Sequence, residues 1–222
     1  MALNLIMLGP PGAGKGTQAE ALARQHGIPR ISTGDILREA VQAGTEVGRL
    51  ARATMDAGRL VGDDVMIAIV SERLNRPDTD AGFVLDGFPR TVPQAEALDA
   101  LVADRAPLVV VDIVVPTEEL VRRLQGRRVC GRCGANASVQ DGPEARCGRC
   151  GGSLVPRSDD ADGVVRERLR VYEERSRPLV AYYRDRPTFR TVDGNQRPPA
   201  VSAAIQAAVT SAGKAAEAER RP

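Results

Sequence analysis

Aromatic side chains are nearly missing from this sequence of 222 residues. Tryptophan is absent, aromatic residues together make up 3% of the chain, and His26 is its single histidine. So few rings argue against the stacking platforms on which single-stranded nucleic acids are bound. A net charge of +2 is also too small to indicate a nucleic-acid or membrane-surface partner. We expect neither partner, and we interpret His26 as a surface residue without a role.

Long apolar runs are missing as well. No run approaches the ~20 residues that a membrane-spanning helix requires. The first residues also lack the basic region and cleavage pattern of a secretory signal. We therefore expect a cytoplasmic protein whose length suits one domain with inserted segments and a sizeable buried core.

Lysine is the third scarce residue, because only Lys15 and Lys214 are lysines among 31 basic side chains. Lys15 lies in GPPGAGKGT (residues 9–17, the phosphate loop), between an apolar run at 3–8 and an amphipathic segment at 18–24. A strand, a glycine-rich turn and a helix in this order cradle phosphate oxygens with backbone N–H groups and the helix N-terminus. A compact ammonium fits this narrow loop better than a planar guanidinium does. The alternative is a glycine-rich turn without a ligand.

The phosphate loop departs at one position from its commonest form, G-x-x-x-x-G-K-[ST]. That form places a hydroxyl, a ligand of Mg²⁺, directly after the lysine. Here Gly16 follows Lys15, and Thr17 comes one residue later. We expect phosphates and water to supply most of the magnesium coordination instead.

The order of elements alternates between strands and helices. We expect strands at 3–8, 29–31, 82–85, 108–115 and 190–192. We expect further helices at 34–42, 46–56, 64–74, 92–103, 117–126, 164–185 and 199–208. Thr33, Thr91 and Thr117 are the expected N-caps, Gly58 a C-cap, and the tail after Ala212 is expected to fray. This alternation predicts a parallel sheet whose ligands bind at the carboxyl ends of its strands.

The stretch LDGFPRT (residues 85–91) ends one of these strands at the same edge as the phosphate loop. Asp86 can hold magnesium there through water, although a structural strand-end carboxylate is the alternative. Arg90 follows a rigid Gly-Phe-Pro turn that aims its guanidinium into the cleft. One helical turn further on, the amide of Gln94 offers a donor and an acceptor to a base edge.

Further arginines recur at positions where a ligand could reach them. They are Arg38, Arg59, Arg123, Arg127, Arg157 and Arg168. Each of them alone could be a solvated surface charge. Together with Arg90 they predict a strongly anionic ligand, as phosphoryl transfer requires.

All four cysteines of the chain lie within residues 130–150. They form two CxxC pairs, each followed by glycine: Cys130 with Cys133, and Cys147 with Cys150. Four thiolates at this spacing predict a closed, tetrahedral zinc ribbon with a structural role. Disulfides or a redox pair are the alternatives, and a cytosolic enzyme favours thiolates.

In this order the motifs resemble the adenylate kinases, in particular the bacterial type with a zinc-bearing lid. The resemblance rests on GPPGAGKGTQA, ISTGD, GRLV at 58–61, LDGFPRT, GRR at 126–128 and RSDD at 157–160, and it covers about residues 3–210. It implies an α/β fold of the P-loop nucleoside monophosphate kinase type, with a parallel five-stranded sheet flanked by helices. The implied parts are a core (1–31, 62–125 and 161–222), an inserted helical NMP-binding segment (32–61) and a zinc-ribbon lid (126–160).

The resemblance also implies a phosphotransferase that catalyses ATP + AMP ⇌ 2 ADP with Mg²⁺. It implies a monomer that serves adenine nucleotide homeostasis. The implied ATP-binding residues are Gly12, Ala13, Gly14, Lys15, Gly16, Thr17, Arg123, Arg127, Asn136, Ala137 and Gln196. The implied AMP-binding residues are Thr33, Arg38, Arg59, Leu60, Val61, Gly87, Phe88, Pro89, Arg90, Gln94, Arg157 and Arg168. The implied catalytic residues are Lys15, Asp86, Arg90, Arg127, Arg157 and Arg168. Asp159 and Asp160 would lock the closed lid, and Cys130, Cys133, Cys147 and Cys150 would bind one structural Zn²⁺.

The sequence departs from the family pattern inside the lid. Asn136, Ala137, Ser138 and Val139 stand where the family usually has a Tyr-His pair and a Phe-Asn-Pro-Pro stretch. Two other functions remain open. A kinase of UMP or CMP would share most of the motifs, although Thr33, Thr91 and Gln94 favour AMP. A zinc-ribbon binding module is the other, but this ribbon has no tyrosine or phenylalanine.

Overall fold

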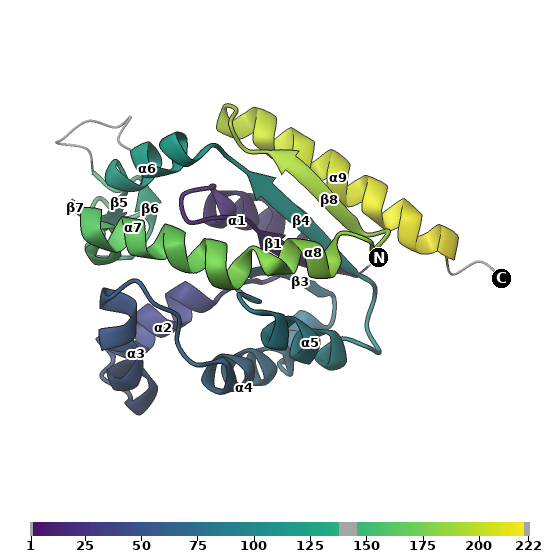
Figure 1. The fold of residues 1–222 in the computed structure, drawn as a ribbon, viewed down its shortest axis with the longest axis horizontal. Coiled ribbons are helices and arrows are strands. Elements are labelled where there is room, and N and C mark those ends of the chain that lie inside the picture. Colours follow the sequence, from purple (N-terminus) through teal and green to yellow (C-terminus); the bar gives the residue numbers. More distant parts are fainter. Residues whose placement is uncertain (1, 138–145, 220–222) are drawn as a thin grey trace.

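The computed structural model describes residues 2–137 and 146–219 of the chain. Its centre is a five-stranded parallel sheet in the order β2-β3-β1-β4-β8, with helices on both faces (Figure 1). The strands are β1 (Leu3–Leu8), β2 (Arg30–Ser32), β3 (Gly82–Asp86), β4 (Leu108–Val114) and β8 (Phe189–Asp193). The parallel five-stranded sheet expected from the sequence is confirmed.

The sheet is covered on both faces because its central strands are apolar at nearly every position. Successive side chains of a strand point to opposite faces, so those of β1, β3 and β4 enter two separate apolar cores. One core packs against α1 (Lys15–His26) and α9 (Pro198–Glu219). The other packs against α4 (Asp63–Leu74), α5 (Val92–Leu101) and α8 (Pro178–Tyr183). These two layers fix the strand ends from which the pocket-lining loops continue.

Two insertions depart from this layered core. The first is the helix pair α2 (Thr33–Gln42) and α3 (Glu46–Asp56), which follows β2. The second lies between α6 (Thr117–Gln125) and α7 (Asp162–Val171) and forms a small antiparallel sheet, β6-β5-β7, from Asn136–Ala137, Arg128–Cys130 and Leu154–Pro156. Figure 1 shows both insertions on the left side of the molecule, α3 below and the small sheet above.

The helix starts differ from the expected caps at two places. Thr91 caps α5 as expected, accepting the N–H of Gln94 on its hydroxyl. For α2 the cap is Ser32, one residue before the expected Thr33, because the Ser32 hydroxyl accepts the N–H of Asp35. For α6 the cap position falls on Pro116 and Thr117 is the first helical residue. Gly58 follows α3 in the left-handed conformation, as expected at a helix end.

Two helical expectations at the C-terminal side are wrong. The helix expected over 164–185 is divided into α7, a π-helix (Tyr172–Ser176) and α8. The tail does not fray after Ala212, because α9 continues to Glu219 with Ala212 and Ala216 buried. Small side chains let this end of α9 pack closely, a tertiary effect that the local sequence does not reveal. None of the described helices is long and apolar enough to cross a membrane.

Candidate active site

A cavity of about 1400 Å³ opens where β1, β2 and β3 end. Its walls are formed by the phosphate loop, α2, residues 58–61, the turn after β3, α6, the lid and α7. This volume exceeds the ~300–1,000 Å³ of a typical single-ligand pocket. The sequence-predicted residues that line it are Gly12, Ala13, Gly14, Lys15, Gly16, Thr17, Thr33, Arg38, Arg59, Leu60, Val61, Asp86, Gly87, Pro89, Arg90, Gln94, Arg123, Arg127, Ala137, Arg157, Asp159, Arg168 and Gln196.

Two predicted substrate-site residues that the structure describes in full, Phe88 and Asp160, do not line the cavity. Phe88 is 1% exposed and packs in the apolar core beside α5, so its ring cannot touch a ligand in the cavity. Asp160 lies behind the cavity wall, where it holds arginines. Asn136 pairs with β5 through its backbone. Ser138 and Val139 lie outside the described residues.

The phosphate loop owes its path to glycines. Gly9, Gly12 and Gly14 all have positive φ, and Gly14 is the N-cap of α1. A Cβ at Gly9 would meet the carbonyl oxygen of Ile113 at 2.6 Å, so only glycine lets the loop lie this close to β4. The N-terminus of α1 therefore faces the cavity, as an anion site requires.

Lys15 is held by the loop that contains it. Its Nζ donates hydrogen bonds to the carbonyl oxygens of Gly9, at 2.6 Å, and Pro10, at 2.8 Å. Burial lowers the pKa of Lys15 to about 8, and nearby arginines add to that effect, while Asp86 opposes it. An ammonium whose charge is this poorly compensated favours an anion beside it.

Four arginines crowd around two carboxylates at the base of the lid. Arg127 donates two hydrogen bonds to Asp160, both at 2.6 Å, and Arg168 donates to the same carboxylate at 2.8 Å. Arg157 forms an ion pair with Asp159 at 2.7 Å. Because Arg127 begins the lid and Asp160 ends it, their bidentate pair fastens the two ends of the insertion together.

The positive charge in this cluster is in excess. Burial and neighbouring cations lower the pKa of Arg157 to about 9 and that of Arg90 to about 10. Arg90, the fourth arginine, donates its Nε to the Gly87 carbonyl at 2.8 Å and not to a carboxylate. Perturbed groups of one sign around a cavity mark a functional site for ligands of the opposite sign.

The turn after β3 is connected to two neighbouring elements. Thr33, at the start of α2, donates its hydroxyl to the carbonyl oxygen of Gly87 at 2.9 Å. Gln94 is 1% exposed, and both polar atoms of its amide have protein partners. Its Oε1 accepts the N–H of Arg90 at 2.8 Å, and its Nε2 donates to Asp63 at 2.7 Å. One amide hydrogen and one lone pair remain for a base edge, fewer than the sequence interpretation assumed.

The opposite wall carries Arg123 and Gln196. Arg123 donates its Nε to Glu119 at 2.7 Å and an Nη to the Gly194 carbonyl at 3.0 Å. Gln196 is exposed and donates to Asp193 at 3.2 Å. Both side chains therefore stand at the cavity rim with their orientation set by local hydrogen bonds.

Some cavity residues were not anticipated from the sequence. Arg30 lines the cavity and donates to Asp86 at 2.9 Å. Ser176, in the π-helix, donates its hydroxyl to the Arg90 carbonyl at 2.8 Å. Their contacts join residues 56 and 86 positions apart, so no local pattern could have revealed them.

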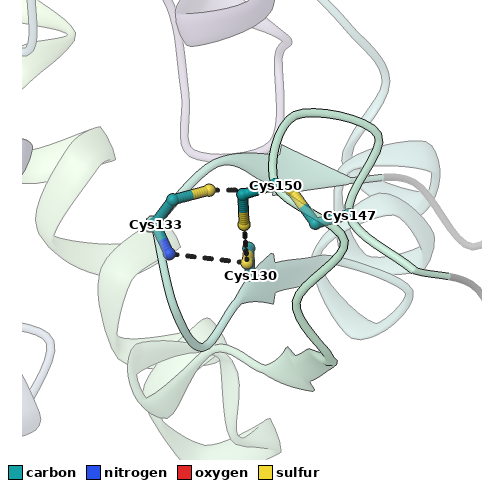
Figure 2. A group of neighbouring side chains, drawn as sticks. All are labelled: Cys130, Cys133, Cys147 and Cys150. Carbon is teal, nitrogen blue, oxygen red and sulfur yellow. Dashed lines mark hydrogen bonds between the residues drawn. The ribbon is translucent and has the colours of Figure 1, made fainter.

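The four cysteines lie together in the lid (Figure 2). All their sulfur atoms lie within 4.8 Å of one another, with Cys130 and Cys150 3.4 Å apart and Cys133 and Cys147 3.6 Å apart. A disulfide would require about 2.05 Å, whereas sulfurs on a tetrahedron with Zn–S bonds of ~2.3 Å lie about 3.8 Å apart. The backbone N–H of Cys133 donates to the sulfur of Cys130 and holds the pKa of that thiol below its usual value. The donor set and spacing fit a metal ion, and the described cysteines are free thiols.

A family model described as adenylate kinase matches residues 7–188 of the chain. An adenylate kinase of Archaeoglobus fulgidus is 51% identical over 199 residues, which cover 87% of this chain and 92% of the relative. An adenylate kinase of Moorella thermoacetica is 51% identical over 208 residues, covering 91% and 96%. One of Symbiobacterium thermophilum is 50% identical over 212 residues, covering 93% and 98%.

Proposed function

The chain belongs to the adenylate kinase family, and on that premise we propose that it catalyses ATP + AMP ⇌ 2 ADP and so balances the adenine nucleotides of the cell. Enzymes of this family are phosphotransferases that act on nucleoside monophosphates, and the chain is an enzyme of this class. The observation that carries the proposal is the large cavity, which joins the phosphate loop to α2 and places Lys15 and four arginines between them. Two nucleotides meeting head to head would set their phosphates beside these cations.

The donor, ATP, is assigned to the side of the phosphate loop. Residues 12–17 would wrap its phosphates with backbone N–H groups, and Lys15 would leave its loop carbonyls for the transferred phosphoryl group. Arg123 and Arg127 would clamp the donor from the base of the lid. The rim position of Gln196 and the cavity position of Ala137 support contacts with the donor base, and Asn136 is assigned beside them.

The acceptor, AMP, is assigned to the opposite side. Arg38 would bind its phosphate, and Gln94 would bind the adenine edge with its remaining hydrogen and lone pair. Thr33, Arg59, Leu60, Val61, Gly87 and Pro89 line that side and would complete the site. Phe88 supports it from the core. The assignment is supported by the hydrogen bond between Thr33 and Gly87, which ties the acceptor helix to the turn that carries Arg90.

Transfer requires positive side chains beside the phosphoryl group, because negative charge spreads over its oxygens in the transition state. Arg90, Arg127, Arg157 and Arg168 are proposed to be these side chains. As the lid closes, the last three would exchange Asp159 and Asp160 partly for phosphate oxygens. When bound, Mg²⁺ neutralises phosphate charge. Asp86 is proposed to hold its water shell, because Gly16 supplies no hydroxyl after Lys15.

This assignment divides the chain into three parts. The proposed core comprises residues 1–31, 62–125 and 161–222, the NMP-binding segment residues 32–61, and the lid residues 126–160. One Zn²⁺ bound by Cys130, Cys133, Cys147 and Cys150 is proposed to keep the lid folded, without touching substrate. We further propose a monomer that acts in the cytoplasm, with ATP, AMP and ADP as its ligands and without nucleic-acid or membrane partners.

A coupled assay of the purified protein with ATP against AMP, UMP, CMP and GMP tests the proposal directly. AMP should be by far the best acceptor, and efficient transfer to UMP or CMP instead would reassign the enzyme within its family. Gln94→Ala should raise the KM for AMP far more than the KM for ATP, because a buried site that hydrogen-bonds its substrate rejects poor matches strongly. Equal effects on both KM values would contradict the acceptor assignment of Gln94.

A further inference from the structure

Arg30, at the start of β2, connects two carboxylates of the cavity. Its side chain is 18% exposed, and the same nitrogen, Nη2, lies 2.9 Å from Asp86 Oδ2 and 3.0 Å from Asp35 Oδ2. A third carboxylate, Glu20, lies 3.8 Å from Nη1. Arg30 is therefore anchored by the sheet through Asp86 and reaches α2 through Asp35.

Asp35 divides its two carboxylate oxygens between two arginines. Oδ2 faces Arg30, and Oδ1 accepts a hydrogen bond from Arg38. Burial would raise the pKa of Asp35, but Arg38 and Arg30 together hold it below its usual value. The carboxylate is thus shared, and Arg38 holds one of its oxygens.

Removing Arg30 would change how Asp35 binds Arg38. A guanidinium that can take both oxygens of a carboxylate binds it bidentately, which is the strongest geometry for such a pair. Asp35 would also lose the cation that compensates its charge when Arg38 leaves. Both effects hold Arg38 on Asp35 and away from an incoming phosphate.

We propose that Arg30 is a positioning residue for acceptor binding: by occupying one oxygen of Asp35 it keeps Arg38 available for the phosphate of the nucleoside monophosphate. This inference rests on the proposed function, which assigns Arg38 to the acceptor. A purely structural Arg30, which only fastens α2 to the sheet, is the competing explanation. It would weaken stability and both ligands together, whereas positioning through Asp35 is specific to the acceptor.

Calorimetric binding of AMP and of ATP, each alone and without Mg²⁺, separates these explanations. Arg30→Met should weaken AMP binding on the order of tenfold, the scale of one hydrogen bond to a charged group. ATP binding should weaken clearly less than AMP binding, because Arg30 reaches the donor side only through Asp86, which also faces Lys15. Arg24→Met is the matched control, because Arg24 is exposed and also pairs with Glu20. It should leave both affinities unchanged.

A double-mutant cycle then tests the route through Asp35. In the Asp35→Asn background, Arg30→Met should have little further effect on AMP affinity. The proposal is overturned if Arg30→Met leaves AMP affinity unchanged, if its full effect persists beside Asp35→Asn, or if AMP and ATP weaken equally. If the wild type binds another nucleoside monophosphate in place of AMP, the proposed acceptor is wrong, but the proposed role of Arg30 is not affected. The same double-mutant cycle measured with that monophosphate then tests the role of Arg30.

Discussion

The core sheet and the lid are held together by different forces. In the core, β1, β3 and β4 bury nearly every side chain between helices, so removal of apolar surface from water stabilises the fold. In the lid, the buried apolar residues among those described are Cys130 and Cys147, and Val155 is 40% exposed. The core can therefore fold by burial alone, whereas the lid depends on its thiols and on the ion pairs at its base. One chain can thus combine a core stabilised by apolar burial with a lid whose two ends are fastened by ion pairs.

The positive charge of Lys15, which we propose to be essential for transfer, belongs to the core. Lys15→Ala tests this and has the largest expected effect. Turnover should fall by roughly two orders of magnitude or more, the scale for losing one preorganised donor. The melting temperature should stay close to that of the wild type, because Lys15 donates only to its own loop. Lys214→Ala, which changes the other lysine of the chain at an exposed site on α9, is the control. Near-normal turnover of Lys15→Ala would refute the assignment.

Metal removal should break the lid and spare the core. Elemental analysis should find one zinc per chain, and chelation or Cys130→Ser should lower the thermal midpoint on the order of 5–10 °C, a loss of a few kcal/mol for a chain of this length. Hydrogen exchange should accelerate in β5 and β7 but not in β1 or β4. ATP binding and some transfer at low temperature should survive, since no cysteine is assigned to substrate.

Ser153→Ala is the control for the lid, because it changes an exposed residue and leaves the four cysteines in place. Its thermal midpoint and metal content should match those of the wild type. A folded, metal-free protein that binds ATP and yet has no activity at any temperature would give the metal more than a structural role. A stoichiometry near zero under reducing conditions would reject the site.

The pKa of Lys15, lowered to about 8, predicts a pH limit set by the core. Above pH 8 the Lys15 ammonium of the free enzyme loses its proton, so kcat/KM should fall about tenfold per pH unit. The value of kcat should fall only at higher pH, because bound phosphates raise the pKa of Lys15 in the complex. The free energy of unfolding should rise over the pH range in which kcat/KM falls. Between pH 8 and the ordinary lysine pKa the unfolded chain binds more protons, so the contribution of Lys15 to the free energy of unfolding rises with pH. A kcat/KM profile that stays level to pH 10 would contradict this.

The smallest expected effect compares two parts of the lid that have the same sequence. Residues 130–134 and 147–151 both read CGRCG, but Arg149 lines the cavity and Arg132 does not. Arg149→Ala should raise the KM for ATP a few-fold, the scale of an exposed charge, and Arg132→Ala should leave it unchanged. Steady-state kinetics at two salt concentrations measures both, and equal effects would show that neither arginine faces the donor.

Local patterns in the sequence predict those parts of the molecule whose causes are local. Glycine spacing indicates the phosphate loop, Gly58 indicates the end of α3, and the CxxC pairs indicate the four-cysteine cluster. Each of these is predictable without tertiary information. The expected N-caps of α2 and α6 differ by one residue from those observed, because Ser32 precedes Thr33 and Pro116 precedes Thr117.

The remaining features depend on partners distant in the sequence. Gln94 is held by Asp63, 31 positions away, and Arg30 by Asp86, 56 positions away, so neither contact has a local signal. Phe88 was assigned to the ligand from its motif, but its ring is buried in the core. The extension of α9 depends on burial of Ala212 and Ala216. In each case tertiary packing decided what the motif left open.

The π-helix at residues 172–176 changes the direction in which side chains point along the helical segment that runs from α7 to α8. Its Arg177 N–H bonds the Tyr172 carbonyl five residues back, which widens the turn just before Pro178, a residue that could donate no hydrogen bond of its own. One surplus residue rotates everything beyond it by about 100° relative to a regular helix. The segment therefore presents Arg168 to the cavity before the π-helix and buries Leu179 and Tyr183 in the core after it. One continuous segment can thus line the cavity with its first half and pack in the apolar core with its second half, because the π-helix between them rotates one half relative to the other.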